Sequence, residues 1–600
     1  MKYMHEFSVW APRAIKMTVK VGDATYSMDS PDEMGWWRVA VESAQAGTDY
    51  GFLIDDDTTA YPDPRSQWQP HGVHGLSRVY DHAAFGWSDC QWHAPPLSSA
   101  VIYELHIGTF TQRGTFDSAI ERLELLVDLG VTHVEVMPVA AFPGDYGWGY
   151  DGVSLFAVQN FYGGPDGFKR FVDACHARGL AVLLDVVYNH FGPVGNYTGK
   201  FGPYITERHH TPWGGAVNFE DAGSDEVRRF FCDNALMWLR DYHVDGLRLD
   251  AVHEFVDRSA VHFMEQLSEE VEALSATLGR ELVLIAESDL NDPRVVMSRE
   301  MGGRGMDAQW SDDFHHALFS LVSAGEPGKG YYDDYGTFEN LAKALKQMFV
   351  YDGQHSRYRG RSHGRPIEGL SAHRFVGFIQ NHDQVGNRAI GDRLEQVPAI
   401  GMARAMIAAG VVLTAPCVPM IFQGEEFAAS TPFQYFAHHE EPSMARAVSE
   451  GRAREFAAFG WRRDQIPDPE KMETFQRSKL NWDEAGVGRH AVMLDWYKRL
   501  IHLRRGSPSL NDGDLGQVKV RFDEEHRWLV MQRGRVMVVC NLGDRPVVVD
   551  NSEGFRLVLC SRNGVVLQTG AATVPEETLA ILSGEDHAKP GEFYSHDSIK

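Results

Sequence analysis

Gly246-Leu-Arg-Leu-Asp250-Ala-Val-His253 is an apolar run that ends abruptly in ionisable residues. This form is typical of a buried β-strand whose C-terminal end opens into a polar site. One such segment precedes it in the chain and two follow it: Asp185-Val-Val-Tyr-Asn-His190, Ile285-Ala-Glu287-Ser288 and Gln380-Asn-His382-Asp383. The repetition predicts parallel strands whose C-terminal ends meet at one polar site.

Amphipathic stretches lie between these strands. Residues 168–177, 227–242 and 260–278 carry apolar side chains at helical spacing, and each stretch leads into an apolar run. If a strand at 306–310 is included, we expect eight strand–helix units over roughly 400 residues. Apolar strands that alternate with helices form parallel sheets. The predicted fold is therefore α/β, a (β/α)8 TIM barrel with insertions.

The two ends of the chain have a different pattern. Residues 1–92 contain short alternating strands separated by Gly, Asp, Pro and Ser, which predicts an N-terminal β-sandwich. The catalytic barrel is expected over residues 93–512, after the tandem prolines of Ala94-Pro-Pro-Leu97. Residues 513–600 return to short apolar strands, so a C-terminal all-β domain, also a β-sandwich, is expected there.

Composition excludes several classes of function. The 600 residues include 57 basic and 83 acidic ones, a net charge of −26, which argues against nucleic-acid binding because that needs clustered Lys and Arg. No uninterrupted apolar run reaches the length of about 18 residues that a membrane span requires. The six cysteines are scattered and are expected to be reduced thiols. A cytoplasmic enzyme is expected, and its oligomeric state is left open.

The acidic residues at the strand ends suit the cleavage of a glycosidic bond. Retaining cleavage needs a carboxylate nucleophile and a carboxylic acid about 5–5.5 Å apart. Arg248 lies two residues before Asp250, on the same face of the strand, so it can hold Asp250 ionised as the nucleophile. Glu287 follows apolar residues, which suits a protonated acid. Four acidic residues at one barrel mouth favour catalysis over helix capping or ion pairing.

The other strand-end residues are candidates for binding the sugar. Asp185 and Asp383 would accept hydrogen bonds from ring hydroxyls, and His190 and His382 would donate them, although a purely structural role is the alternative for either histidine. The turn at 146–151 contains glycines that allow close backbone approach and aromatic side chains that could form a stacking platform.

The four segments resemble the conserved regions of the α-amylase family of glycoside hydrolases and transferases, across the whole barrel. The resemblance implies that Asp250 is the nucleophile, Glu287 the general acid/base and Asp383 the transition-state stabiliser. It implies that the activity needs no cofactor, and that the N-terminal domain is similar to the module of branching and debranching members. It also implies substrate contacts for five matching residues: Tyr150, Asp185, His190, Arg248 and His382.

Within that family, the chain is most similar to members that cleave the α-1,4 bond next to the terminal trehalose of maltooligosyl trehalose. The likeness lies in residues 61–75, 146–153, 230–239 and 380–388. It implies that maltooligosyl trehalose and related α-glucans are the substrates and that trehalose is a product.

Recognition of the trehalose end must come from loops around the leaving-group side. Trp213, after the third strand, and His253, just beyond the nucleophile, are the candidates, and loop packing or capping is the alternative for each. Tyr331 and Tyr332 are weaker candidates. Asn189 matches a position at which some amylases bind calcium, but partner ligands are not evident, so no metal is expected.

Two other functions are considered. A branching or debranching enzyme has the same scaffold, but a branching enzyme would typically have Ser-His-Asp-Glu where this chain has Asn381-His-Asp-Gln384. A non-catalytic glucan-binding protein would be expected to lack one of the three carboxylates, and all three are present.

Overall fold

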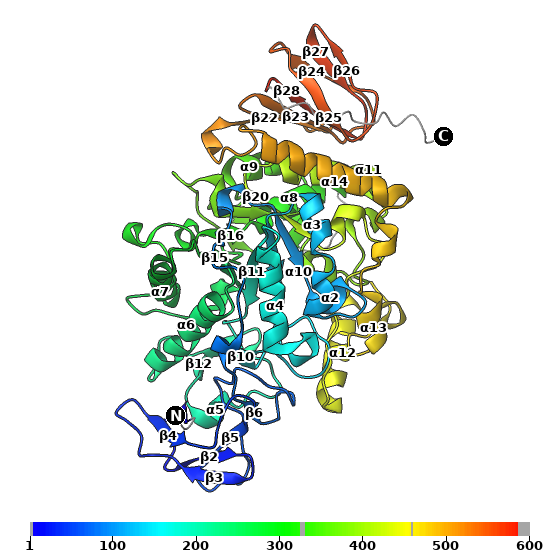
Figure 1. Ribbon diagram of the computed structural model, residues 1–600. Helices are drawn as coiled ribbons and strands as arrows, with labels where there is room; N and C mark the ends of the chain where they lie inside the picture. The colour runs from blue at the N-terminus through cyan, green and yellow to red at the C-terminus, as the bar shows by residue number, and fades with distance from the viewer. Residues whose placement is uncertain (1–3, 324–330, 458–459, 586–600) are drawn as a thin grey trace.

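A closed barrel of parallel strands forms the centre of the computed structural model, which describes residues 4–323, 331–457 and 460–585 (Figure 1). Its strands, in barrel order, are β7 (Ile102–Leu105), β8 (His133–Val136), β11 (Ala181–Val186), β14 (Gly246–Leu249), β15 (Val283–Ala286), β16 (Ala308–Trp310), β19 (Phe375–Gly377) and β20 (Val418–Phe422). The strand expected at 306–310 is present as β16. The predicted (β/α)8 barrel is therefore confirmed.

Helices surround the barrel (Figure 1). They are α1 (Ile107–Phe110), α2 (Phe116–Ile120), α3 (Leu123–Leu129), α4 (Gly164–His176), α5 (Thr198–Phe201), α6 (Ser224–Asp241), α7 (Phe263–Leu278), α8 (Asp312–Val322), α9 (Phe338–Gln347), α10 (His382–Gly386), α11 (Gly401–Thr414), α12 (Pro442–Ala457), α13 (Met472–Arg477) and α14 (Gly488–Gly506). Helix α7 begins at Phe263 rather than at 260 because the His262 side chain accepts from the Met264 N–H and caps the helix.

The barrel interior changes from apolar to charged along the strands. Alternate residues of a strand point to the same face. Ile102, Leu183 and Ile285 belong to one buried apolar cluster, and the next residues in phase with them are Glu104, Asp185 and Glu287. The charged face therefore lies at the C-terminal ends of the strands, which is where the active sites of such barrels lie.

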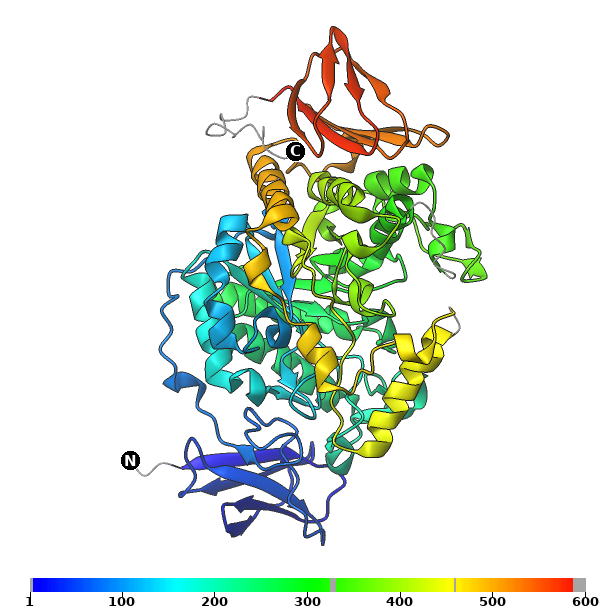
Figure 2. The ribbon, with the colours of Figure 1, turned by 90° about the vertical axis from the view of Figure 1, so that its right-hand side faces the viewer.

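Two small antiparallel sheets form the N-terminal part. Strand β1 (His5–Trp10) pairs with β4 (Trp36–Val41), and the second sheet has the order β3 (Ala24–Ser27), β2 (Met17–Val21), β5 (Asp49–Ile54) and β6 (Ser77–Arg78). They lie at one end of the molecule (Figures 1 and 2). The Trp36 indole N–H donates to Glu226 at 2.9 Å, and Arg65 pairs with Asp233 at 2.8 Å, so this part is attached to helix α6.

The C-terminal part lies at the opposite end and has two antiparallel sheets with a buried apolar core between them (Figure 2). The five-stranded sheet has the order β21 (Val518–Asp523), β22 (Trp528–Arg533), β23 (Val536–Asn541), β28 (Thr578–Ser583) and β25 (Arg556–Cys560), and the three-stranded sheet has the order β24 (Val547–Asn551), β27 (Gly570–Val574) and β26 (Val566–Gln568). This all-β domain confirms the expectation for the chain end.

The remaining strands of the described chain form three antiparallel pairs. They are β9 (Ala140–Ala141) with β10 (Ser154–Val158), β12 (Ile205–Thr211) with β13 (Gly214–Val217), and β17 (His355–Ser356) with β18 (Arg361–Ser362). Within the described ranges, none of the helices has both the length and the apolar character needed to cross a bilayer.

Candidate active site

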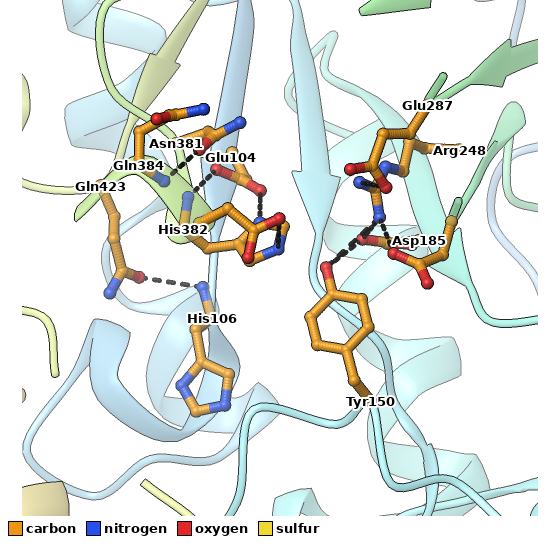
Figure 3. A network of polar contacts seen from close by, with 12 residues as sticks. Glu104, His106, Tyr150, Asp185, Arg248, Glu287, Asn381, His382, Gln384 and Gln423 are labelled. Carbon is orange, nitrogen blue, oxygen red and sulfur yellow. Dashed lines mark hydrogen bonds and ion pairs between the residues drawn. The ribbon is translucent and has the colours of Figure 1, made fainter. Parts of the chain in front are cut away.

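The predicted site residues gather at the C-terminal ends of the barrel strands (Figure 3). Asp250 directly follows β14, Glu287 directly follows β15, and His382 and Asp383 open helix α10 after β19. Figure 3 shows His382 and Glu287 on opposite sides of the barrel mouth. Residues separated by more than a hundred positions are therefore brought to one place by the closure of the barrel.

Arg248 connects the acidic side chains on one side of the mouth. Its Nη1 donates to Asp185 Oδ2 at 2.6 Å and to Asp250 Oδ1 at 3.0 Å, and its Nη2 donates to Glu287 Oε2 at 2.5 Å. The guanidinium is fully buried and lies 4.0 Å from the ring centroid of Trp310. A planar group with five donors can hold several carboxylates at once, so Arg248 fixes their relative positions.

Asp250 and Glu287 lie side by side on this guanidinium. Burial, and then the negative charge of Glu287, raise the pKa of Asp250 well above its ordinary value, although Arg248 opposes the shift. Glu287 also accepts from the Ala251 N–H at 3.0 Å. The apolar surroundings expected for Glu287 are not observed, because its carboxyl accepts from these two donors. The expectation that Arg248 holds Asp250 ionised is not met in the free protein, because burial and Glu287 outweigh the guanidinium.

Asp383 faces His382 on the other side of the mouth. Its side chain is 37% exposed, against 10% for Asp250, so it is the more accessible carboxylate. Burial alone would raise its pKa, but the His382 imidazolium, whose Nε2 lies 3.4 Å from Oδ2, lowers it. Asn387 donates to Asp383 Oδ1 at 3.0 Å. Asp383 is therefore held as a carboxylate that is open to a bound molecule.

Asp185 makes contacts that the sequence did not predict. Its side chain is 1% exposed, and its Oδ2 accepts from Arg248 and from the Tyr150 hydroxyl at 2.6 Å. Its Oδ1 is buried and makes no hydrogen bond to the described residues, so a contact of this oxygen with a ring hydroxyl stays a prediction. Asp185 thus positions Arg248 and Tyr150 from below, whereas Tyr150 stacks on His382 with ring centroids 5.0 Å apart.

His190 also differs from the prediction that it donates to the sugar. Its Nε2 lies 3.0 Å from the carbonyl oxygen of Tyr150, and burial lowers its pKa to about 4. The neutral ring therefore donates to the backbone and can only accept at Nδ1. Its face stacks on Trp213, with centroids 4.8 Å apart and planes at 9°. Trp213 lies in the β12–β13 turn and is 49% exposed, so its other face is available to a ligand.

The remaining candidates lie around this centre. His253 follows the nucleophile in a short 3-10 helix, and its side chain is 21% exposed. The Tyr332 hydroxyl lies 3.0 Å from Gln384 Oε1 and 3.0 Å from His315 Nε2, which ties the segment after β16 to the fourth sequence segment. The side chain of Tyr331 lies outside the described part of the structure.

The turn at 146–151 is more buried than expected for a platform on which a sugar ring stacks. Tyr146 and Trp148 are 3% and 6% exposed, and both are stacked on neighbouring rings of the chain. Of the three expected aromatics, Tyr150 stacks on His382 and Trp148 packs against the edge of the same ring. Gly149 has a φ of 100°, and a Cβ there would lie 2.2 Å from the Pro138 carbonyl oxygen, so the close backbone approach requires glycine.

Sequence reasoning missed several polar residues of the barrel interior. Glu104 binds His382, Glu135 lies beside Glu104, and Asp312 opens helix α8 two residues after the end of β16. Burial, and then the charge of Glu287, raise the pKa of Asp312 well above its ordinary value. The available signal was an acidic residue inside an apolar strand, as in Val101-Ile-Tyr-Glu-Leu105.

A metal site is not apparent where the resemblance suggested one. The amide oxygen and nitrogen of Asn189 are buried and make no hydrogen bond to the described residues. Among those residues, no group of three or more His, Cys, Asp or Glu side chains is arranged to hold a metal ion.

Comparison with known proteins shows which protein family the chain resembles. Residues 55–204 match the family model described as the alpha amylase catalytic domain, and residues 513–581 match a domain of unknown function, DUF3459. The chain is 48% identical to malto-oligosyltrehalose trehalohydrolase of a Rhizobium species, covering 96% of this chain and 97% of the relative. It is 49% identical to the protein of that name from Mycobacterium tuberculosis, covering 98% and 100%.

Solved structures agree with the fold. A Salmonella typhimurium protein superposes with a TM-score of 0.88 and 36% identity, covering 97% of this chain and 98% of its own. A pullulanase solved with maltotetraose superposes with a TM-score of 0.74 at 17% identity, covering 98% of this chain and 87% of its own, and this second likeness concerns the fold alone.

Proposed function

This chain belongs to the malto-oligosyltrehalose trehalohydrolase family of α-amylase-type glycoside hydrolases, and we propose that it releases trehalose from maltooligosyl trehalose by retaining cleavage of the adjacent α-1,4 bond. One observation carries the proposal: Arg248 holds Asp250 and Glu287 side by side, while Asp383 faces the same opening. A carboxylate and a carboxylic acid placed together are what the retaining reaction needs.

In the first step, Asp250 attacks the anomeric carbon and Glu287 gives its proton to the glycosidic oxygen. The bond to trehalose breaks, trehalose leaves as the neutral alcohol, and the maltooligosyl unit is bonded to Asp250. This step requires Asp250 as the carboxylate and Glu287 as the carboxylic acid. Arg248 donates to both side chains and so keeps them together at the reacting bond.

In the second step, Glu287 accepts a proton from water as the water oxygen attacks the anomeric carbon. The bond to Asp250 breaks, and the maltooligosaccharide leaves with the α-anomeric configuration at its new reducing end. Positive charge develops at the ring in both steps. Asp383, kept ionised by His382, would accept hydrogen bonds from ring hydroxyls and stabilise that charge.

Selection of the trehalose end is assigned to residues outside the strand ends. Trp213 presents an exposed ring face beside the mouth, and such faces stack on sugar rings. His253 lies in the 3-10 helix that follows β14, and Tyr332 lies in a 3-10 helix after α8. We propose that the enzyme forms trehalose in the cytoplasm. The acidic composition and the scattered cysteines support this location.

The experiment offers purified protein maltotriosyl trehalose, maltopentaose and glycogen separately and follows the products by chromatography and proton NMR. We expect trehalose and maltotriose from the first substrate at the highest kcat/KM, and the α-anomer of maltotriose as the initial product. New α-1,6 branches or preferential debranching would instead support the branching or debranching alternative. An initial β-anomer would exclude the retaining mechanism.

A further inference from the structure

Two acidic side chains lie next to each other inside the barrel, below the catalytic mouth. Glu104 of β7 and Glu135 of β8 are register partners on adjacent parallel strands. Both point inward, because Ile102 is in phase with Glu104 and Leu183 is the register partner of Glu135, and both apolar residues belong to the interior cluster. Glu104 is 1% exposed and Glu135 is 0% exposed. The mechanism proposed above uses neither of them.

Glu104 is fully engaged with His382. Its Oε1 accepts from His382 Nδ1 at 2.5 Å, and its Oε2 accepts from the His382 backbone N–H at 2.9 Å (Figure 3). These two bonds fix both the position of the residue and the rotation of its ring. The Nε2 atom is thereby directed at Asp383.

Glu135 is in the opposite situation. Neither of its carboxyl oxygens has a hydrogen-bond partner among the described residues, and both are inaccessible to solvent. Burial, and then the charge of Glu104, raise its pKa well above the ordinary value; Asp185 adds to the shift, while Arg248 and His382 oppose it. An ionised carboxylate without donors is costly in such a place, so Glu135 holds the proton. Glu104, by contrast, accepts a hydrogen bond at each of its two oxygens, as a carboxylate does.

The groups around His382 determine its charge. Burial alone would lower its pKa, but the carboxylates of Asp383 and Glu104 raise it well above the ordinary value. Asp185 and Glu135 also interact with its charge, and His106 is neutral because burial lowers its pKa to about 3. Tyr150 is stacked on its face and Trp148 lies against its edge. His382 therefore owes its charge to the two carboxylates.

We propose that Glu104 is a positioning residue that keeps His382 doubly protonated and its Nε2–H directed at Asp383, and that Glu135 is the neutral partner that leaves the negative charge on Glu104. This inference rests on the proposed function in one respect, the role of Asp383 at the substrate. It extends the site from the mouth into the barrel interior and adds two residues to those inferred from the strand ends.

The first test follows the ring ¹⁵N signals of His382 with rising pH in the free wild-type enzyme, Glu104→Gln and Glu135→Gln. A pH profile of kcat/KM would not isolate His382, because its alkaline limb also reports loss of the Glu287 proton. The amide in Glu104→Gln removes a negative charge next to the imidazolium, so the pKa of His382 should fall by about one unit or more. In Glu135→Gln a neutral amide replaces a neutral acid, so we expect the pKa of His382 to stay in place.

Two results would overturn the proposal: an unchanged His382 titration in Glu104→Gln, or a shift in Glu135→Gln as large as that expected for Glu104→Gln. Circular dichroism and thermal unfolding check that each variant is folded.

A second measurement needs neither a variant of Glu104 nor any substrate. Histidine ¹⁵N NMR of the free wild-type enzyme at pH 7, with the His382 signal assigned by its loss in His382→Asn, should show both ring nitrogens protonated. A neutral ring would refute the inference. Failure to release trehalose would refute the proposed function, while the NMR result on the free enzyme would stand independently.

Discussion

Two neighbouring regions of the mouth differ in how far they are buried. One is the cluster of strand-end residues around Arg248, and the other is the hairpin that carries Trp213. In the first, Arg248 is fully buried, and Asp185 is 1% exposed, with every charge close to an opposite one. In the second, Trp213 is 49% exposed on a two-residue turn, and its known partner is the ring of His190. Bond cleavage is assigned to the rigid region, and choice of the leaving group to the exposed one.

The difference has a physical reason. Charges that must act on a reacting atom need positions accurate to a fraction of an ångström, which buried strands and several simultaneous hydrogen bonds provide. A ring that stacks on a sugar tolerates small displacements, so a surface loop is sufficient. We therefore expect changes in the cluster to lower kcat for every substrate and changes in the hairpin to act on one substrate only.

The largest effect is expected from Asp250→Asn, and an equal one from Glu287→Gln. The amide of the first cannot form the covalent bond, and that of the second cannot protonate the leaving oxygen, so kcat should fall by roughly 10⁴-fold or more. Steady-state kinetics on maltotriosyl trehalose measure the loss, with Asp23→Asn, an exposed residue in the N-terminal part, as the matched control. Near-normal turnover by either variant would show that the residue does not have the catalytic role proposed for it.

Arg248→Lys should lower kcat by about 10²- to 10³-fold. The lysine keeps the positive charge, but a single ammonium cannot reproduce the fork that joins Asp185, Asp250 and Glu287. Kinetics on maltotriosyl trehalose and maltopentaose should show the same factor, because both substrates use the cluster. The matched control is Arg13→Lys on the exposed surface. Equal activity of the lysine variant would mean that charge alone is sufficient.

Tyr150→Phe should lower kcat by about tenfold. The change removes the hydroxyl that donates to Asp185 at 2.6 Å, while the ring that stacks on His382 stays in place. Tyr26→Phe removes a distant hydroxyl that lies 3.3 Å from Ser43 and serves as the control. If the loss appeared only in KM, the hydroxyl would be a substrate contact rather than part of the support for Asp185.

The smallest and most selective effect is expected from Trp213→Ala. KM for maltotriosyl trehalose should rise by about three- to tenfold, since one stacking contact is lost, and kinetics on maltopentaose should be almost unchanged. Ile205→Ala, which shortens an exposed apolar side chain on the same hairpin, is the control. A parallel loss on both substrates would place Trp213 in the general binding surface and weaken the contrast between the two regions.

Much of the fold could be predicted, because its signals are local. The apolar runs and helical spacings identify the barrel strands, and even the short β16 was found within two residues of its start. The boundary of α7 was less accurate, since capping by His262 depends on one side-chain hydrogen bond. The site residues were found for the same local reason: acidic residues end apolar strands.

At the site, the positions of the predicted residues were correct, but most of their hydrogen-bond partners were not predicted. Glu287 follows apolar residues in sequence but turns its carboxyl toward Arg248. Asp185 ends a strand like the others, yet its Oδ2 is engaged by Tyr150 and Arg248. Glu104 was overlooked because its partner, His382, lies 278 positions away.

The sequence by itself determined the barrel class, the strand ends and the set of carboxylates available there, because periodicity and residue type are properties of each segment alone. Only the tertiary structure decided which carboxylates share one guanidinium, that His190 is neutral and stacked on Trp213, and that Glu104 and Glu135 lie beneath the mouth. Those properties depend on barrel closure, which brings distant strands to within hydrogen-bonding distance and removes their charges from water.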